Sequence, residues 1–314
     1  MIKGFSITPP VLGRISIGKV VEREGKRLPE KSDSFAITTQ VQLRGGDWLA
    51  HPLDDELRQV QGGKIRSIPV RVMFDDPDLN FRAAYTAFDR RTGRQVCSGD
   101  GQTCQRLTTK GIESLACPTP QLCALGSNGI CKPYGRLNVT VGDDDATGSF
   151  VFRTTGYNSI RTLAARLQYF KALSGGKLSC LPLELKLRGK STTQSHGTPI
   201  FYVDMTLRSG LATEEALSQA VALCDQRHGA GFDQKALDEA ARLGFANGFF
   251  TDTEDDAPAV LEEFYPPADS QDKGRKTLKD KLAAKTDGGT VNSADGARSS
   301  VSDCSTAVPG DPSC

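Results

Sequence analysis

Five of the nine cysteines in this chain lie close together in the sequence, and they restrict how this part of it can fold. They are Cys97, Cys104, Cys117, Cys123 and Cys131. The segment that contains them is rich in glycine, proline and threonine and follows neither a helical nor a strand-like hydrophobic period. Such a segment cannot bury an apolar core of its own, whereas thiolates bound to a metal ion can supply the missing folding energy. The cysteines therefore predict an insert that is held by a metal.

A disulfide framework is the other common use of clustered cysteines, and the cellular compartment decides between the two. The first residues of the chain contain no apolar stretch long enough for a secretory signal, so we expect a cytoplasmic protein with reduced thiols. No apolar run approaches the roughly 18 residues that a membrane span needs. These observations favour metal binding over disulfides.

Four of the five cysteines would complete a tetrahedral site. Cys117, Cys123 and Cys131 share one loop, whose prolines fix the path of the chain. For the fourth ligand we choose Cys104, because Cys97 ends an apparent strand, where cysteine is often a small core residue. Four thiolates are typical of structural zinc and leave no open position for chemistry. An iron–sulfur cluster or unligated thiols remain alternatives, because the segment has none of the tight Cys-x2-Cys pairs that would decide between them.

Hydrophobic periodicity predicts an α+β protein. Strict alternation from Phe35 to Leu43 indicates a half-buried strand, and residues 136–154 have the pattern of a hairpin. Apolar residues at helical spacing predict a helix over 160–173. Two further strands over 181–187 and 201–207 and two helices over 213–227 and 233–245 complete the pattern. We therefore expect an antiparallel sheet with a cysteine-ligated metal-binding insert at about 97–131 and C-terminal helices.

Charge and aromatic content divide the chain. Residues 252–314 contain 13 acidic and 7 basic residues, a net charge of −6, so the +1 of the whole chain leaves +7 for residues 1–251. The last part, from residue 266, has no aromatic residue and cannot bury enough apolar surface to offset the entropy of ordering. We predict an α+β body over 1–210, a helical segment over 211–251 and a disordered tail over 252–314.

A possible anion site lies at the start of the helix predicted over 160–173. Asn158 and Ser159 stand where free backbone N–H groups and the helix dipole favour a phosphate, and Arg153 and Arg161 flank them. The alternative is that Asn158 or Ser159 caps the helix while the arginines pair with acids.

Two groups were candidates for chemistry, and neither supports a catalytic assignment. Asp143-Asp144-Asp145 could hold Mg²⁺, but consecutive carboxylates point in different directions and the stretch is typical of a hairpin turn. His196 stands in a polar loop, and no serine or acid is spaced to form a triad with it. We assign no catalytic residue.

Two motifs resemble the phage recombination directionality factor family. One is Cys117-Pro-Thr-Pro-x-x-Cys123-x7-Cys131-Lys-Pro-Tyr-Gly-Arg-Leu137, and the other is Arg153-Thr-Thr-Gly-Tyr-Asn-Ser-Ile-Arg161. The resemblance covers residues 1 to about 210. It implies a non-enzymatic protein that binds a large serine integrase on DNA and turns recombination from integration to excision. Relatives in mobile elements are often described only as metal-binding proteins or possible hydrolases.

Our first hypothesis is accordingly a metal-stapled interaction protein that redirects a serine integrase and reaches DNA through it. One alternative is a DNA-associated accessory protein of a phage or conjugative element, which would use the +7 body against phosphates. Another is a metal-dependent hydrolase or nuclease. The last would need an open position on the metal, which four cysteine ligands do not leave.

Overall fold

The computed structural model describes residues 2–23, 26–127, 129–143, 147–191, 199–252 and 256–265, and it describes only the backbone of residues 19–23, 26–32 and 127. These residues belong to one compact unit that extends from residue 1 to residue 269. None of the helices described is both long and apolar enough to cross a membrane.

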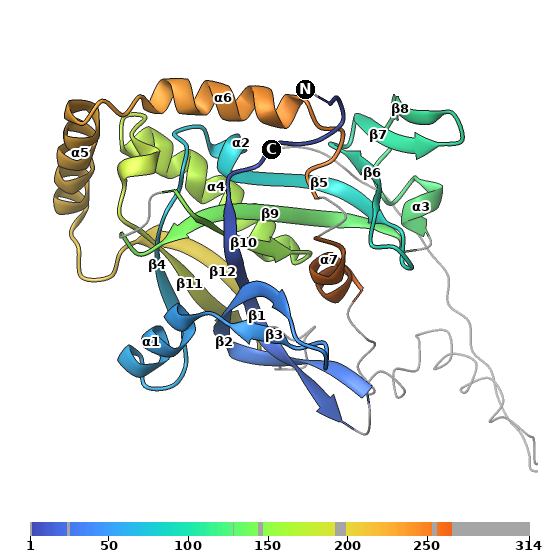
Figure 1. The fold of residues 1–314 in the computed structure, drawn as a ribbon, viewed down its shortest axis with the longest axis horizontal. Coiled ribbons are helices and arrows are strands. Elements are labelled where there is room, and N and C mark those ends of the chain that lie inside the picture. The colour runs from blue at the N-terminus through green and yellow to red at the C-terminus, as the bar shows by residue number, and fades with distance from the viewer. Residues whose placement is uncertain are drawn as a thin grey trace, which may run out of the picture. The chain divides into compact units, whose positions relative to one another are not determined.

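Twelve strands of the described residues form one sheet (Figure 1). They are β1 (Val11–Arg23), β2 (Lys26–Gln42), β3 (Trp48–Ala50), β4 (Ser67–Arg71), β5 (Phe81–Phe88), β6 (Gln95–Gly99), β7 (Thr103–Thr108), β8 (Gly111–Ala116), β9 (Cys131–Val141), β10 (Ser149–Thr154), β11 (Leu183–Lys190) and β12 (Ile200–Leu207). The main path runs β3-β2-β1-β10-β9-β5-β6-β7-β8. Its neighbours pair antiparallel except β1 and β10, which run parallel.

Strand β9 is the junction of the sheet, because it pairs with three other strands. It pairs with β10 as the predicted hairpin over 136–154, with Phe150 opposite Val139. The half of β9 that begins at Cys131 pairs with β5, and its end at Val141 pairs with β4. From β4 a short arm continues to β11 and then to β12.

Seven α-helices and one short 3-10 helix of the described residues accompany the sheet. They are α1 (Pro52–Val60), α2 (Pro77–Asn80), α3 (Ala124–Ser127), α4 (Tyr157–Leu173), the 3-10 helix Leu178–Cys180, α5 (Thr213–Gly229), α6 (Gln234–Ala246) and α7 (Ala257–Phe264). The mixed α+β class, the large antiparallel sheet and the helices after it are confirmed.

The aliphatic core lies where the sheet meets α4. Leu163 and Leu167, four residues apart on one face of α4, are fully buried against the sheet, which contributes Leu137 and Val203. Burying a side chain of this size stabilises the fold by roughly 1.5–3 kcal/mol. Helix α4 therefore anchors the β9 region and the β12 arm to each other.

The helices after residue 210 are not a separate segment. Helix α6 begins as predicted, with the Asp233 carboxylate accepting from the backbone N–H of Ala236 at 3.0 Å. Its C-terminal end binds the start of the chain, since Gly4 N donates to Asn247 O at 2.8 Å. The N-terminal residues thereby tie α6 to the body.

The cysteine segment forms regular strands although its sequence follows neither hydrophobic period, and the apparent strand that ends at Cys97 is part of β6. Strands β6, β7 and β8 extend the sheet beyond β5 (Figure 1). In β6 the buried positions do alternate, but Gln95, Cys97 and Gly99 occupy them. A search for alternating aliphatic residues misses such a strand.

The predicted start of the disordered tail at residue 252 is wrong for Asp252 and for residues 256–265. Helix α7 packs on the sheet, and the fully buried Phe264 ring lies 4.8 Å from Phe88 and 6.0 Å from Tyr134 between ring centroids. The prediction relied on the net charge of residues 252–314 as a whole and therefore overlooked a short apolar run in α7. Residues 266–314 lie outside the described residues.

Candidate functional site

The register of the sheet brings the cysteines together. Cys131 in β9 pairs with Ala87 in β5, Ala87 pairs with Cys97 in β6, and Cys97 pairs with Arg106 in β7. Directly paired residues point to the same face of a sheet. Two thiols and a guanidinium therefore share one row, and the small Ala87 leaves room between Cys131 and Cys97.

A second row lies next to the first, where Cys104 in β7 pairs with Gly99 in β6. A Cβ atom added at Gly99 would lie 2.7 Å from Cys104 Cβ and 2.9 Å from Cys117 Sγ. Real Cβ atoms do not approach other atoms so closely, so glycine is required here for the Cys117 thiol to reach the sheet.

The loop after β8 folds back over this face. Its start is fixed by Cys117 N, which donates to Gln102 O at 2.8 Å. Its turn is so tight that a Cβ atom at Gly126 would lie 1.8 Å from Pro120 O. The result is one buried cluster of Cys97, Cys104, Cys117 and Cys131, with the half-buried Cys123 at its margin.

Arg106 links Cys123 to the cluster. Its Nε lies 3.5 Å from Cys97 Sγ and its Nη2 lies 3.4 Å from Cys123 Sγ. Burial opposes the Cys123 thiolate, but the backbone N–H of Leu125 and the Arg106 guanidinium outweigh burial and lower the pKa of this thiol. The sequence analysis missed Arg106; its position two residues after Cys104, on the same strand face, is the signal that could have indicated it.

The pKa values of Cys104 and Cys131 shift in the opposite direction. Burial, followed by the neighbouring Cys97, raises the pKa of Cys104 to about 11 and that of Cys131 to about 12. Several thiolates cannot share a buried site without cationic charge to balance them, because each disfavours ionisation of the next. Arg106 supplies one such charge, and a divalent metal ion would supply two.

The donor set fits a thiophilic metal, but the ligand geometry is not formed. Within the described part of the chain, no group of three or more His, Cys, Asp or Glu side chains is arranged so that it could hold a metal ion. The absence of a side chain at Gly99 lets Cys104 and Cys117 approach each other closely. Of the two competitors for the fourth position, both Cys97 and Cys104 belong to the cluster.

The residues of the predicted anion site are not brought together. Arg153 is buried and its Nε lies 3.2 Å from Asp252 Oδ1, while the Ser159 hydroxyl accepts from Val203 N at 3.0 Å. Helix α4 is capped by Gly156 without a side-chain hydrogen bond, so neither Asn158 nor Ser159 is its cap. Asn158 and Arg161 are exposed on the outside of α4.

Asp143 has a structural role. Its carboxylate lies 2.7 Å from Arg71 Nε and 2.6 Å from Arg208 Nη1. The hydrogen bond with Arg208 has the largest effect on its pKa, and together with the hydrogen bond to Arg71 it lowers this pKa to about 2. It clamps the turn after β9 to two other strand ends, as expected of a turn residue. Asp144, Asp145 and His196 lie outside the described residues.

Comparison with known proteins relates the chain to a family. No curated protein and no solved structure matches the chain significantly. The model of the Gp3-like family, described as recombination directionality factor-like, matches residues 12–208. The match spans more than half of the 314 residues and includes the whole cysteine cluster. The chain therefore belongs to the Gp3-like, recombination directionality factor-like family, which relates it to control of the direction of site-specific recombination.

Proposed function

We propose that this protein binds a large serine integrase and redirects it towards excision. The observation that supports the proposal is the family match over residues 12–208. In this role the protein needs no catalytic residue of its own, and it reaches DNA through the integrase.

The redirection rests on differential affinity. A ligand shifts a conformational equilibrium only by the difference between its affinities for the two states, and a change from 1:99 to 99:1 takes about 5.5 kcal/mol. The factor must therefore bind one integrase state much more tightly than the other. It must also stay bound, so it acts stoichiometrically.

The thiol cluster serves this role as a staple. We propose zinc held by Cys104, Cys117, Cys123 and Cys131, with an iron–sulfur cluster as the alternative metal centre. When bound, the metal supplies folding energy to a region whose buried residues are mostly thiols. The staple holds the loop after β8 against the sheet and so fixes the outer end of the β5–β8 region.

The proposal is tested by recombination in vitro with the cognate integrase. Adding the protein in amounts equal to the integrase should allow recombination between the two hybrid sites and should inhibit the integration reaction. Trace amounts should have no effect. A cognate integrase that shows neither binding nor a change of direction contradicts the proposal. So does a strong, salt-dependent shift of DNA without integrase, which favours a DNA-binding accessory protein.

Metal analysis of the purified protein tests the staple. About one zinc per chain is expected, whereas a brown protein that absorbs near 400 nm would indicate an iron–sulfur cluster. Cys117→Ser and Cys131→Ser should lose the metal, and Cys314→Ser should retain it as the matched control. If Cys97→Ser loses the metal while Cys104→Ser retains it, Cys97 is the fourth ligand.

A further inference from the structure

Three arginines lie directly opposite one another on adjacent strands of the sheet. Arg153 in β10 pairs with Arg136 in β9, and Arg136 pairs with Arg82 in β5. We call these three residues the arginine row. Like charges that face each other across strands destabilise a sheet unless anions compensate them. Successive residues of a strand alternate in direction, so the row lies on the face of β5 and β9 opposite to Ala87 and Cys131.

The segment before α7 compensates two of the three arginines. Asp252 Oδ1 lies 3.2 Å from Arg153 Nε and 3.6 Å from Arg136 Nε. Asp256 forms a second ion pair with Arg153, and Thr251 O accepts from Arg136 Nη1 at 3.1 Å. These carboxylates come from a part of the chain about 100 residues away in sequence from β10.

Arg82 has no such partner. Its guanidinium lies over the ring of Phe245, 4.9 Å from the centroid, and makes no hydrogen bond or ion pair with any described residue. Burial and the neighbouring Arg136 lower the pKa of Arg82, and Asp78, which stays beyond ion-pair distance, only partly opposes this. The third position of the arginine row, at the exposed Arg82, therefore has no ion pair among the residues that the structure describes.

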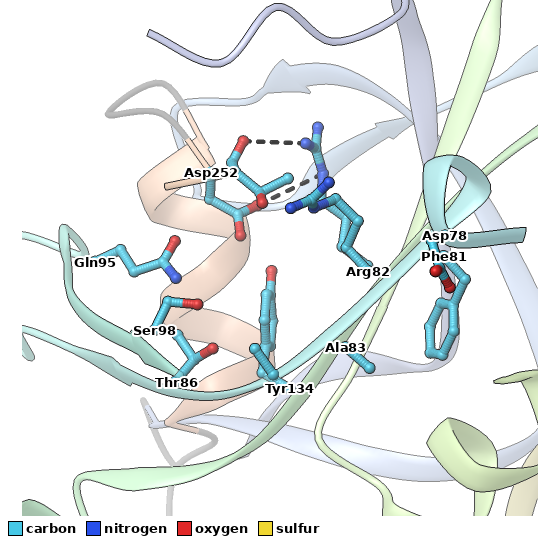
Figure 2. Close-up of a pocket in the computed structure, with 12 residues that line it drawn as sticks. Asp78, Phe81, Arg82, Ala83, Thr86, Gln95, Ser98, Tyr134 and Asp252 are labelled. Carbon is cyan, nitrogen blue, oxygen red and sulfur yellow. Dashed lines mark hydrogen bonds and ion pairs between the residues drawn. The ribbon is translucent and has the colours of Figure 1, made fainter. Parts of the chain in front are cut away.

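A pocket with a volume of about 350 Å³ opens beside Arg82. Figure 2 shows Thr86, Gln95 and Tyr134 pointing from β5, β6 and β9 into the space below Asp252. The Thr86 side chain is 1% exposed and that of Gln95 is 9% exposed, yet Thr86 Oγ1 and Gln95 Oε1 have no hydrogen-bond partner among the described residues. Buried polar atoms without partners cost free energy, so their concentration in one pocket points to a polar ligand.

The charge and shape of the pocket define that ligand. Two arginines and two carboxylates line it. Asp252 Oδ1 is engaged by Arg136 and Arg153, whereas Asp252 Oδ2 and the Tyr134 hydroxyl have no hydrogen-bond partner among the described residues, and Arg82 is the arginine of the lining without an ion pair there. A planar carboxylate can accept two parallel hydrogen bonds from a guanidinium. Thr86 and Ser98 add hydroxyl donors, and the Gln95 amide can turn to donate its N–H groups.

We propose that this pocket receives the carboxylate of an acidic side chain from a partner protein, which completes the arginine row at Arg82. A phosphate within a DNA backbone is flanked by two sugars, which obstruct its entry into a pocket. An aspartate or glutamate side chain projects from its own backbone and can enter. If the function proposed above is correct, the acidic residue belongs to the integrase.

Calorimetric titration of the isolated full chain tests the pocket without any integrase. The probes are the amide-capped amino acids N-acetylglutamate amide and N-acetylglutamine amide, together with inorganic phosphate. The carboxylate probe should bind one to one, and its uncharged glutamine counterpart should not. Arg82→Gln should weaken binding about tenfold or more, because it removes the guanidinium fork, and Thr86→Val should weaken it by removing a buried donor. Arg91→Gln, an equal charge change in the exposed loop after β5, is the matched control and should bind normally.

Three results overturn the proposal. They are the absence of carboxylate binding, binding that Arg82→Gln leaves unchanged, and tighter binding of phosphate than of the carboxylate. If Thr86→Val fails to fold, Ser98→Ala replaces it. Binding that is unchanged both in a folded Ser98→Ala protein and in Arg82→Gln then contradicts the proposal. Because no integrase is present, a failure here is distinct from a failure in the recombination assay.

Discussion

The two faces of β5 and β9 meet the same electrostatic difficulty in different ways. One face carries the arginine row, and the chain itself supplies Asp252 and Asp256 to compensate two of its members. The other face carries the thiol cluster, where Arg106 is the counter-charge in contact with the sulfurs. The arginine face is thus compensated from within the chain at two of its three positions, whereas the thiol face fits a charge brought from outside.

This difference shows why burial alone does not define a site. Most members of both clusters are buried, but an ion pair within the chain stabilises only the fold, while a group without a partner also creates affinity for a ligand. The positions without compensation, the thiols and Arg82, are those for which we propose ligands. The predictions below test this division, beginning with the largest expected effect.

Truncation after Phe250 should prevent cooperative folding. It removes both carboxylates of the arginine row and the Phe264 ring, and breaking one buried ion pair costs about 3–5 kcal/mol, as does loss of a buried phenylalanine side chain. Their sum is comparable with the 5–15 kcal/mol total stability of a typical domain. Urea unfolding followed by circular dichroism measures the effect. A chain truncated after Tyr265 is the control and should unfold cooperatively; equal stability of the two truncations would contradict the role of α7.

Asp252→Asn should destabilise the full chain by about 3–5 kcal/mol, because it leaves Arg136 and Arg153 facing each other with less negative charge. Chemical denaturation gives the difference in unfolding free energy. Asp55→Asn, the same change at an exposed position in the first turn of α1, should cost less than about 1 kcal/mol. Similar values for the two variants would show that Asp252 does not compensate the row.

The sequence could predict the thiol face but not the arginine face, and the reason is physical. Cysteine is rare and its clustering carries meaning even without knowledge of the fold, so the set from Cys97 to Cys131 was found. Arginines are common, and Arg82, Arg136 and Arg153 become a row only through the register of three strands. Their acids lie in a segment whose net charge resembles that of a disordered tail.

The helices and strands that the sequence predicts are mainly those with aliphatic residues at regular spacing. Helix α4 and the β9–β10 hairpin follow from such periodicity, and α6 follows from the cap at Asp233. Strands β6 to β8 do not, because glutamine, cysteine and glycine fill the inward positions of β6. Helix α7 is short, and its burial depends on Phe88 and Tyr134, which no local pattern reveals.

Gly99→Ala should damage the thiol face by about 1–3 kcal/mol, the usual cost of overpacking. The new methyl group would meet Cys104 Cβ at 2.7 Å and Cys117 Sγ at 2.9 Å, so the loop after β8 must move. Hydrogen exchange should show faster exchange in β6 to β8 while β1 and β10 keep their protection. Gly45→Ala, where no atom lies within 4 Å of the added Cβ, is the control. Unchanged exchange in β7 and β8 would mean that Cys117 does not need this close approach.

The most gradual expected effect is a pH dependence on the arginine face, at Glu263 in α7. Burial raises the pKa of this carboxyl to about 7, although the N–H of Thr155 and the charges of Arg14 and Lys132 act in the opposite direction. In the unfolded chain the group titrates near 4.3. Between these values the folded protein binds more protons than the unfolded one, so the contribution of Glu263 to stability is complete below about pH 4.3 and declines as the pH rises to about 7. Since one pKa unit corresponds to about 1.4 kcal/mol, the shift from about 4.3 to about 7 corresponds to a decline of about 4 kcal/mol over the whole range, of which about 2 kcal/mol falls between pH 5 and pH 7. Comparison with Glu263→Gln, which cannot ionise, cancels the titration of all other groups. The free energy of unfolding of the wild type relative to this variant should fall between pH 5 and pH 7, and a constant difference would show that Glu263 is ionised in the folded protein throughout this range.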